Sequence, residues 1–247
     1  MTEYDKQLLE KEFDFLADEY AKEHQKNIRI SGETPDFFSE YKIRDLKALT
    51  KFQCFLPKTI FDFGSGIGNS IPFFRKYFKD SQLIAADVSS RSIEISKTRF
   101  PGQEKYLLID KSISITTESQ DLIFSACVFH HIQHDQHIYW LKELYRVASL
   151  NSMIVIFEHN PLNPLTVYAV NTCPIDINAK LIRSGQLKKK LIYSGWSDIE
   201  ISYKFFFPSF LRFLRPLEKY LSWCCFGGQY LISGRKYKEK IQSEGQE

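Results

Sequence analysis

The hydrophobic pattern of the chain changes character near residue 57. From there on, short apolar stretches alternate with amphipathic stretches whose apolar positions recur at helical spacing. The apolar stretches predict β-strands at 58–63, 82–87, 104–109, 120–126 and 152–158. The amphipathic stretches predict helices at 68–79, 90–99 and 135–147. This alternation is typical of an α/β fold with a doubly wound, mostly parallel sheet.

The two ends of the chain follow different patterns. Two helical stripes precede the alternation, at 3–24 and 35–51, and Thr34-Pro35 has the form of an N-cap followed by proline at the first helical position. The C-terminal part predicts a helix near 178–194, a β-rich stretch at 196–207, a helical stripe at 209–224 and a short strand at 229–233. The two late strands can pair antiparallel, so they fit one edge of a seven-stranded sheet.

Composition and charge narrow the class of protein. A content of 43% hydrophobic and 26% charged residues over 247 positions, with a net charge of +3, describes an ordinary globular chain. The basic run at 188–190 is small for a nucleic-acid-binding face, so we expect no nucleic-acid partner. The five cysteines show no metal or disulfide spacing, and the N-terminus lacks an apolar leader, which predicts a cytoplasmic protein with reduced thiols.

A glycine-rich turn is the most informative local motif. Gly64, Gly66 and Gly68 separate a predicted strand from a predicted helix, which is a place where a ligand can lie against bare backbone N–H groups. The dinucleotide fingerprint would require a further glycine where this chain has Asn69. A phosphate-binding P-loop is excluded because no Gly-Lys-Ser/Thr follows.

Acidic residues end the first three predicted strands. Asp62 suits a ligand that carries an ammonium or sulfonium group. Asp87 lies about 20 residues beyond the glycines, where a carboxylate can accept both ribose hydroxyls; the alternative is an aspartate that caps the next helix. Asp110, with the backbone of Lys111, can meet an adenine edge, or it can stabilise a turn.

These motifs occur together in one family. The strings FDFGSGIG, AADVS, LLID, QDLIFSACVFHHI and ELYRVASLNSMIVIFEHN, over residues 58–160, resemble class I S-adenosylmethionine-dependent methyltransferases of the bacterial type 11/12-like family. The resemblance implies a Rossmann-like sheet of order 3-2-1-4-5-7-6 with the last-formed strand antiparallel. It also implies S-adenosylmethionine as cofactor. The residues it implies for that cofactor are Asp62, Gly64, Ser65, Gly66 and Gly68 for the methionine part, Asp87 for the ribose, Asp110 and Lys111 for the adenine, and Val88 and Cys127 beside them.

Histidines after the fourth and fifth strands are the candidate catalytic groups. We expect His130 or His159 to act as the general base, because imidazole accepts a proton near neutral pH. The expected acceptor is a hydroxyl of a small molecule, a saccharide or a lipid-linked intermediate. No metal site is expected, and His131 is interpreted as structural. The alternatives are a methyltransferase-like binding protein without turnover and, less favoured, an NAD(P)-dependent oxidoreductase.

The terminal segments are expected to shape the acceptor pocket. We predict an N-terminal helical lid at 1–56 and one methyltransferase domain at 57–247, in which 160–228 form helical and aromatic insertions. The tail resembles an uncharacterised bacterial branch of the family that is loosely associated with cell-surface saccharide or lipid pathways. The apolar side of 209–224 is interpreted mainly as core packing, with peripheral membrane contact as the alternative. The sequence predicts no oligomeric state.

Overall fold

A computed structural model describes residues 32–176 and 178–237, and the helix predicted at 3–24 lies outside these residues. Helix α3 (Pro35–Phe52) begins as predicted: Thr34 is its N-cap, and the hydroxyl of Thr34 accepts from the N–H of Phe37 at 3.2 Å. Because Pro35 has no N–H to satisfy and its φ is preset, it stabilises the first turn. The division of the chain at residue 56 stays a prediction.

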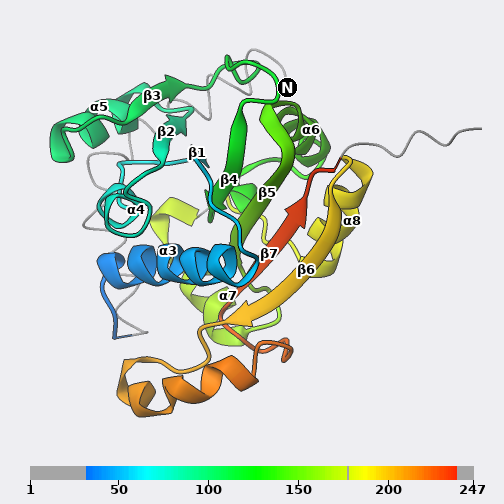
Figure 1. The fold of residues 1–247 in the computed structure, drawn as a ribbon. Coiled ribbons are helices and arrows are strands. Elements are labelled where there is room, and N and C mark those ends of the chain that lie inside the picture. The colour runs from blue at the N-terminus through cyan, green and yellow to red at the C-terminus, as the bar shows by residue number, and fades with distance from the viewer. Residues whose placement is uncertain (1–31, 177, 238–247) are drawn as a thin grey trace, which may run out of the picture.

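The described residues form one seven-stranded sheet of order β3-β2-β1-β4-β5-β7-β6, as predicted (Figure 1). Strands β1 to β5 pair in parallel, and β7 runs antiparallel to both of its neighbours. The carboxyl ends of the five parallel strands therefore meet at one edge of the sheet. The strands are β1 (Thr59–Phe63), β2 (Gln82–Asp87), β3 (Lys105–Leu108), β4 (Gln120–Ala126), β5 (Ala148–His159), β6 (Ser197–Lys204) and β7 (Gln229–Arg235).

Helices cover both faces of the sheet (Figure 1). Side chains alternate along β1, so Phe61 and Phe63 pack with α6 and α8, whereas Ile60 packs with α3 and α4. Each face thus buries its own apolar cluster, which fixes the register of β1. The remaining helical elements are α4 (Ile71–Tyr77), α5 (Ser90–Arg99), α6 (His137–Val147), α7 (Pro164–Asn171), α8 (Ser184–Tyr193) and the 3₁₀ segments η2 (Phe129–His131), η3 (Pro174–Asp176) and η4 (Ser209–Tyr220).

The structure corrects several predicted boundaries. Helix α4 begins at Ile71 rather than residue 68, because the positive φ of Gly68 belongs to the preceding turn. Helix α8 begins at Ser184 rather than near 178, since the N–H of Lys180 donates to the carbonyl of His130 at 2.7 Å and keeps that segment extended. Helix α7 and segment η3 were not predicted, although Asn163-Pro164 is an N-cap pair.

The interpretation of 209–224 as core packing is wrong. Segment η4 is a 3₁₀ helix with Pro216 inside it and a non-helical Leu211, and none of its residues is buried. The segment therefore lies on the surface, and its large apolar side chains face solvent. These exposed side chains are Phe210, Phe213, Leu217 and Tyr220, followed by Trp223 and Phe226. In the described part of the chain, no helix is long and apolar enough to cross a membrane.

Candidate active site

The glycine turn after β1 leaves space beside its middle glycine. Gly64, Gly66 and Gly68 have φ values of +79°, +52° and +81°, a region that only glycine adopts freely. A Cβ at Gly64 would lie 2.3 Å from Val128, and one at Gly68 would lie 2.2 Å from the hydroxyl of Ser96. A Cβ at Gly66 would meet no atom within 4 Å. The outer glycines therefore serve close packing, and the middle one borders open space.

Asp87 holds this turn in place from the end of β2. One carboxylate oxygen accepts from the N–H of Gly66 at 2.7 Å, and the other accepts from the N–H of Ser89 at 2.9 Å. The N-cap of α5 is Ser89, whose hydroxyl accepts from the N–H of Ser92, so capping of α5 does not explain Asp87. Asp87, the residue predicted to bind the ribose, thus lies directly beside the open space at Gly66.

Two buried polar groups at the same edge fit a charged, hydrogen-bonding ligand. The hydroxyl of Ser65 is buried and has no hydrogen-bond partner, which is costly unless a ligand supplies one. Asp62 is also buried, and this burial, together with the nearby charge of Asp87, raises the pKa of Asp62 to about 8. A cationic group bound beside Asp62 would restore its ionised form, as the amino group of S-adenosylmethionine can.

The predicted adenine residues follow β3 at the neighbouring strand end. Asp110 and Lys111 are exposed. The N–H of Ile109 donates to the carbonyl of Asp87 at 2.8 Å, so this strand end is hydrogen-bonded to the residue predicted to bind the ribose. The hydroxyl of Tyr139 donates to the carbonyl of Lys111. Val88 is half-buried against the core cluster behind them.

Glu158 organises the ends of β4 and β5. One of its carboxylate oxygens accepts from the N–H groups of Val128 and Phe129, at 2.9 and 2.7 Å, and the other accepts from Nδ1 of His130 at 2.6 Å. Burial alone would lower the pKa of His130, but the charges of Glu158 and Asp176 outweigh it and raise this pKa to about 10. Both predicted base candidates lie here, since the rings of His130 and His159 are 5.1 Å apart between centroids.

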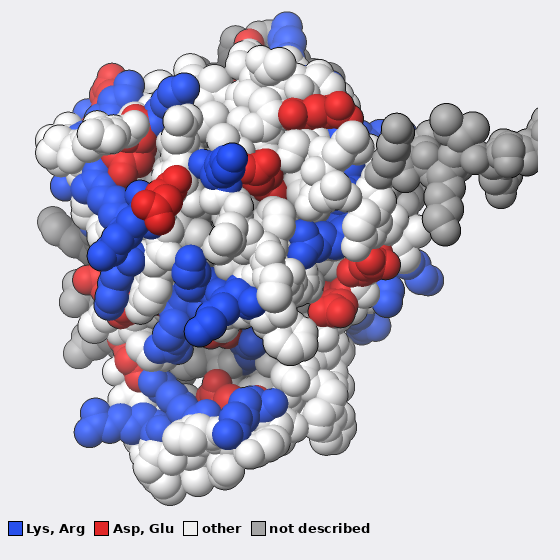
Figure 2. Space-filling view, in the orientation of Figure 1, with Lys and Arg blue, Asp and Glu red and all other residues white. Residues whose placement is uncertain are grey.

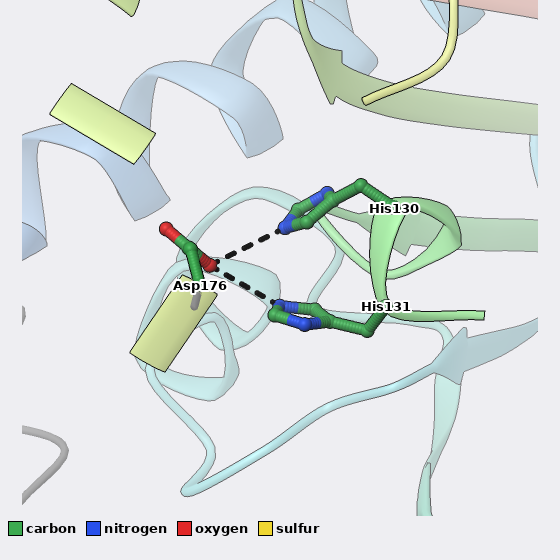
Figure 3. Close-up of side chains that lie close together, drawn as sticks. All are labelled: His130, His131 and Asp176. Atoms are coloured by element: carbon green, nitrogen blue, oxygen red, sulfur yellow. Dashed lines mark ion pairs between the residues drawn. The ribbon is translucent and has the colours of Figure 1, made fainter. Parts of the chain in front are cut away.

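Asp176 joins this group from η3 (Figure 3). One of its carboxylate oxygens lies 3.5 Å from Nε2 of His130 and 3.4 Å from Nε2 of His131. Burial would raise the pKa of Asp176, but hydrogen bonding to the two imidazoles outweighs burial and lowers it. His131, interpreted as structural from the sequence, therefore points into the same cluster as His130 (Figure 3).

Comparison with known proteins identifies a domain family for the central part of the chain. A family model described as a methyltransferase domain matches residues 61–156, the segment that carries the glycine turn and the strand-end acids. Residues 61–156 belong to the methyltransferase domain family. No curated protein sequence matches the chain significantly.

Solved structures agree with this methyltransferase domain. A SAM dependent methyltransferase from Archaeoglobus fulgidus is 20% identical, with a TM-score of 0.59 over 81% of this chain and 99% of its own. A possible histamine N-methyltransferase from Thermotoga maritima is 17% identical, with a TM-score of 0.61 over 92% and 99%. The plantazolicin methyltransferase, solved with SAH, is 16% identical, with a TM-score of 0.62 over 94% and 100%.

These likenesses confirm the predicted fold, and the family model agrees with the predicted family over residues 61–156. At such identities a structural neighbour shows the fold, so the neighbours' substrates do not transfer to this chain. Family and fold together support S-adenosylmethionine-dependent methylation as the class of reaction. The presence of SAH in the plantazolicin enzyme agrees with the predicted cofactor.

Sequence reasoning assigned α3 to a lid but did not single out its Lys42, which reaches the candidate site. Lys42 is buried, and its ammonium donates to the sulfur of Cys127 at 3.3 Å. Burial would raise the pKa of the Cys127 thiol, but Lys42 and His159 outweigh it and lower this pKa to about 6. The hydroxyl of Tyr41 donates to the side chain of Gln229, which lies beside Cys127. The available signal in the sequence was the position of Lys42, a charged residue between the apolar residues Tyr41 and Ile43 of an amphipathic helix.

The predicted cofactor residues therefore surround one edge of the sheet, although their individual roles stay predictions. Cys127 has a positive φ of +59°, which is strained for a side chain with a Cβ. Its N–H donates to the carbonyl of Phe157 at 2.8 Å, so pairing with β5 holds this conformation. Strain of this kind often marks a functional site.

Proposed function

We propose that this protein transfers the methyl group of S-adenosylmethionine to a hydroxyl of a small molecule, a saccharide or a lipid-linked intermediate. The observation that carries the proposal is the open space at Gly66, whose N–H is held by the carboxylate of Asp87. When bound, the cofactor supplies an activated methyl group. The chain must then hold the acceptor in line, exclude water and remove the hydroxyl proton.

Three strand-end aspartates are proposed to bind the amino group, the ribose and the adenine of the cofactor. Asp62, which burial keeps protonated near neutral pH, gains an attractive partner when a cationic amino group approaches it. Asp87 presents a carboxylate, oriented by the N–H groups of Gly66 and Ser89, at the position proposed for the ribose hydroxyls. Asp110 and the backbone of Lys111 stand at the adenine end. No part of this arrangement needs a pyrophosphate, which disfavours the NAD(P) alternative.

The proton acceptor is better argued for His159 than for His130. His130 gives one ring nitrogen to Glu158 and directs the other toward Asp176, so neither nitrogen is left for a substrate. His159 is partly exposed at the end of β5, next to Cys127. We therefore propose His159 as the general base in preference to His130, the other histidine predicted from the sequence. A positioned base distinguishes this proposal from a binding protein without turnover.

Replacing His159 by asparagine is expected to lower kcat by about 100-fold or more, because a positioned general base contributes about 10²–10⁴-fold. Affinity for S-adenosylhomocysteine should stay within about twofold, since no cofactor contact is assigned to His159. Steady-state kinetics and calorimetry on the same preparation measure both values. A decrease in kcat of less than about tenfold would remove His159 from the mechanism.

The exposed apolar side chains of η4 and of the turn that follows it support an acceptor presented at a membrane. Phe210, Phe213 and Trp223 are 76%, 70% and 78% exposed. Several large hydrophobic side chains exposed close together often mark a surface that contacts a partner or a membrane. Arg212 and Lys219 are exposed on the same segment. Figure 2 shows Lys and Arg side chains gathered beside a mainly uncharged surface at this end of the molecule. Apolar side chains flanked by cations fit an anionic lipid surface.

Two assays test the acceptor class and the membrane contact separately. Labelled S-adenosylmethionine is supplied with lipid, saccharide, protein and RNA fractions of a cell extract, and label in the lipid or saccharide fraction is expected. Exclusive labelling of protein or RNA would contradict the proposal. Changing Phe213 and Trp223 to serine should weaken sedimentation with anionic vesicles by at least about tenfold, because burial of an aromatic side chain contributes about 1.5–3 kcal/mol.

The control for this vesicle experiment is Tyr193→Ser, which removes an aromatic side chain that is 69% exposed on α8. Vesicle binding by this variant should equal that of the unaltered protein. Equal loss in both variants would show unspecific adhesion, and no loss in either would refute contact through η4. The cytoplasmic location remains a prediction.

A further inference from the structure

His130, His131 and Asp176 form a cluster with the composition of a metal site. Each offers one ligand atom, and these three atoms all lie within 4.8 Å of one another. The two imidazoles come from η2 and the carboxylate comes from η3, and Figure 3 shows both rings pointing toward the same carboxylate. Three ligands from two elements, brought together across 45 residues of chain, are unusual for a surface ion pair.

The two distances from Asp176 match those of ligands that share a cation, whereas the whole cluster spans 4.8 Å and would contract slightly around an ion. One oxygen of Asp176 lies 3.5 Å from Nε2 of His130 and 3.4 Å from Nε2 of His131. Charge-assisted N–H···O bonds measure about 2.7–2.9 Å, which is clearly shorter. Two ligands bound at about 2.1 Å to one ion lie about 3.0–3.5 Å apart, at octahedral or tetrahedral angles.

Glu158 supplies the outer support that a histidine ligand needs. Its carboxylate accepts from Nδ1 of His130 at 2.6 Å, which leaves Nε2 as the nitrogen that can bind a metal. The other oxygen of Glu158 is held by the N–H groups of Val128 and Phe129. A buried carboxylate behind a ligating imidazole fixes both its tautomer and its orientation. A cation at this site would displace the proton of His130, and the two carboxylates with two neutral imidazoles would then carry a formal charge of −2, which one divalent cation balances.

We propose that His130, His131 and Asp176 bind a first-row divalent transition-metal cation such as Zn²⁺ or Co²⁺. Two imidazoles and one carboxylate favour such an ion over Mg²⁺ or Ca²⁺, which prefer oxygen ligands. Three protein ligands leave coordination positions open for a ligand oxygen. This site differs from the sequence-based expectation that the chain has no metal.

The location gives this cation a role that rests on the proposed function. The cluster lies at the ends of β4 and β5, and His159 is beside it. An acceptor hydroxyl bound to the cation loses its proton to His159 more easily, because a bound divalent ion lowers the pKa of its oxygen ligand. The oxygen then forms a bond to the methyl carbon, the carbon–sulfur bond breaks, and S-adenosylhomocysteine leaves with the electron pair.

Titration of the full-length protein with Co²⁺ tests the site without reference to activity. We expect one equivalent to produce visible d–d absorption typical of a low-coordinate site. The variants Asp176→Asn and His131→Ala should each weaken Co²⁺ affinity by at least about 100-fold, since loss of an outer-shell partner alone costs about 10–100-fold. The matched control is His134→Ala, which removes a nearby histidine whose Nε2 pairs with the carbonyl of Lys180.

Each outcome of this titration decides the proposal. Stoichiometric binding that both ligand variants lose and the control keeps supports it. Absence of stoichiometric binding, or undiminished binding by Asp176→Asn, overturns it and leaves His130 as an imidazolium paired with two carboxylates. A strong thiolate-to-cobalt band would assign the ion to a cysteine instead. Calorimetry with S-adenosylhomocysteine on every variant shows whether each is folded, and it separates failure of the metal site from failure of the methyltransferase proposal.

Discussion

Replacing Asp87 by alanine is expected to abolish measurable binding of S-adenosylhomocysteine. The carboxylate is assigned two ribose hydroxyls, and hydrogen bonds to a charged group contribute about 1.5–3 kcal/mol each. Their joint loss corresponds to about 10²–10⁴-fold in affinity. The N–H of Gly66 also loses its 2.7 Å partner, so the glycine turn is less well held in the variant. Isothermal titration calorimetry measures the affinity, and thermal denaturation shows whether the protein is folded.

The control for Asp87 is Ser89→Ala. This change removes the N-cap of α5, a loss of about 1 kcal/mol of stability, and leaves the carboxylate of Asp87 intact. Its affinity for S-adenosylhomocysteine should stay within about threefold of the unaltered value. If Asp87→Ala binds as tightly as the unaltered protein, the ribose assignment is wrong. Binding of NAD without affinity for S-adenosylhomocysteine would contradict the methyltransferase proposal itself.

Gly66→Ala is expected to weaken S-adenosylhomocysteine binding by about 10–100-fold. Its methyl group would enter space that no protein atom occupies within 4 Å, and overfilling a closely packed contact costs about 1–3 kcal/mol. The positive φ of +52° adds a cost of about 1–2 kcal/mol to the stability of the folded protein. Calorimetry gives the affinity, and chemical denaturation gives the free energy of unfolding.

Two other glycines separate cofactor contact from folding. Gly185 in α8 also faces open space but has no positive φ, so Gly185→Ala should leave affinity unchanged and raise stability by up to about 1 kcal/mol. Gly68→Ala would place a methyl 2.2 Å from the hydroxyl of Ser96 and should mainly destabilise the fold. Unchanged binding by Gly66→Ala would mean that the cofactor does not lie against this turn.

The parts of the fold that sequence reasoning predicted well are those with local signals. The strands of the parallel sheet are short apolar runs between turn residues, and the glycine turn follows the first of them directly. Their order could be inferred because it accompanies a recognisable set of motifs over residues 58–160. Boundaries were less accurate, since the start of α8 depends on a contact between Lys180 and His130 that lies outside the local sequence.

The candidate site was predicted only in part, for the same physical reason. Asp87 and Gly66 can be recognised from their spacing relative to the predicted strands. Lys42, by contrast, contacts Cys127 from a helix 85 residues away in the chain. Asp176 carries no motif that ties it to His130. The apolar stripe at 209–224 was misread because its periodicity is compatible with burial, whereas Pro216 and the 3₁₀ geometry of η4 turn those side chains outward.

The position of β7 has a consequence for how the protein forms during synthesis. Strand β7 lies between β5 and β6 and is almost wholly buried, yet it is the last strand among the residues that the structure describes. Until the ribosome has released residues 229–235, β6 has no neighbour in the sheet and β5 keeps one open edge. His159 pairs with Gln229 at the end of this ladder. The part of the candidate site that contains His159 is therefore completed last, after the strands that carry the glycine turn and Asp87 are already paired.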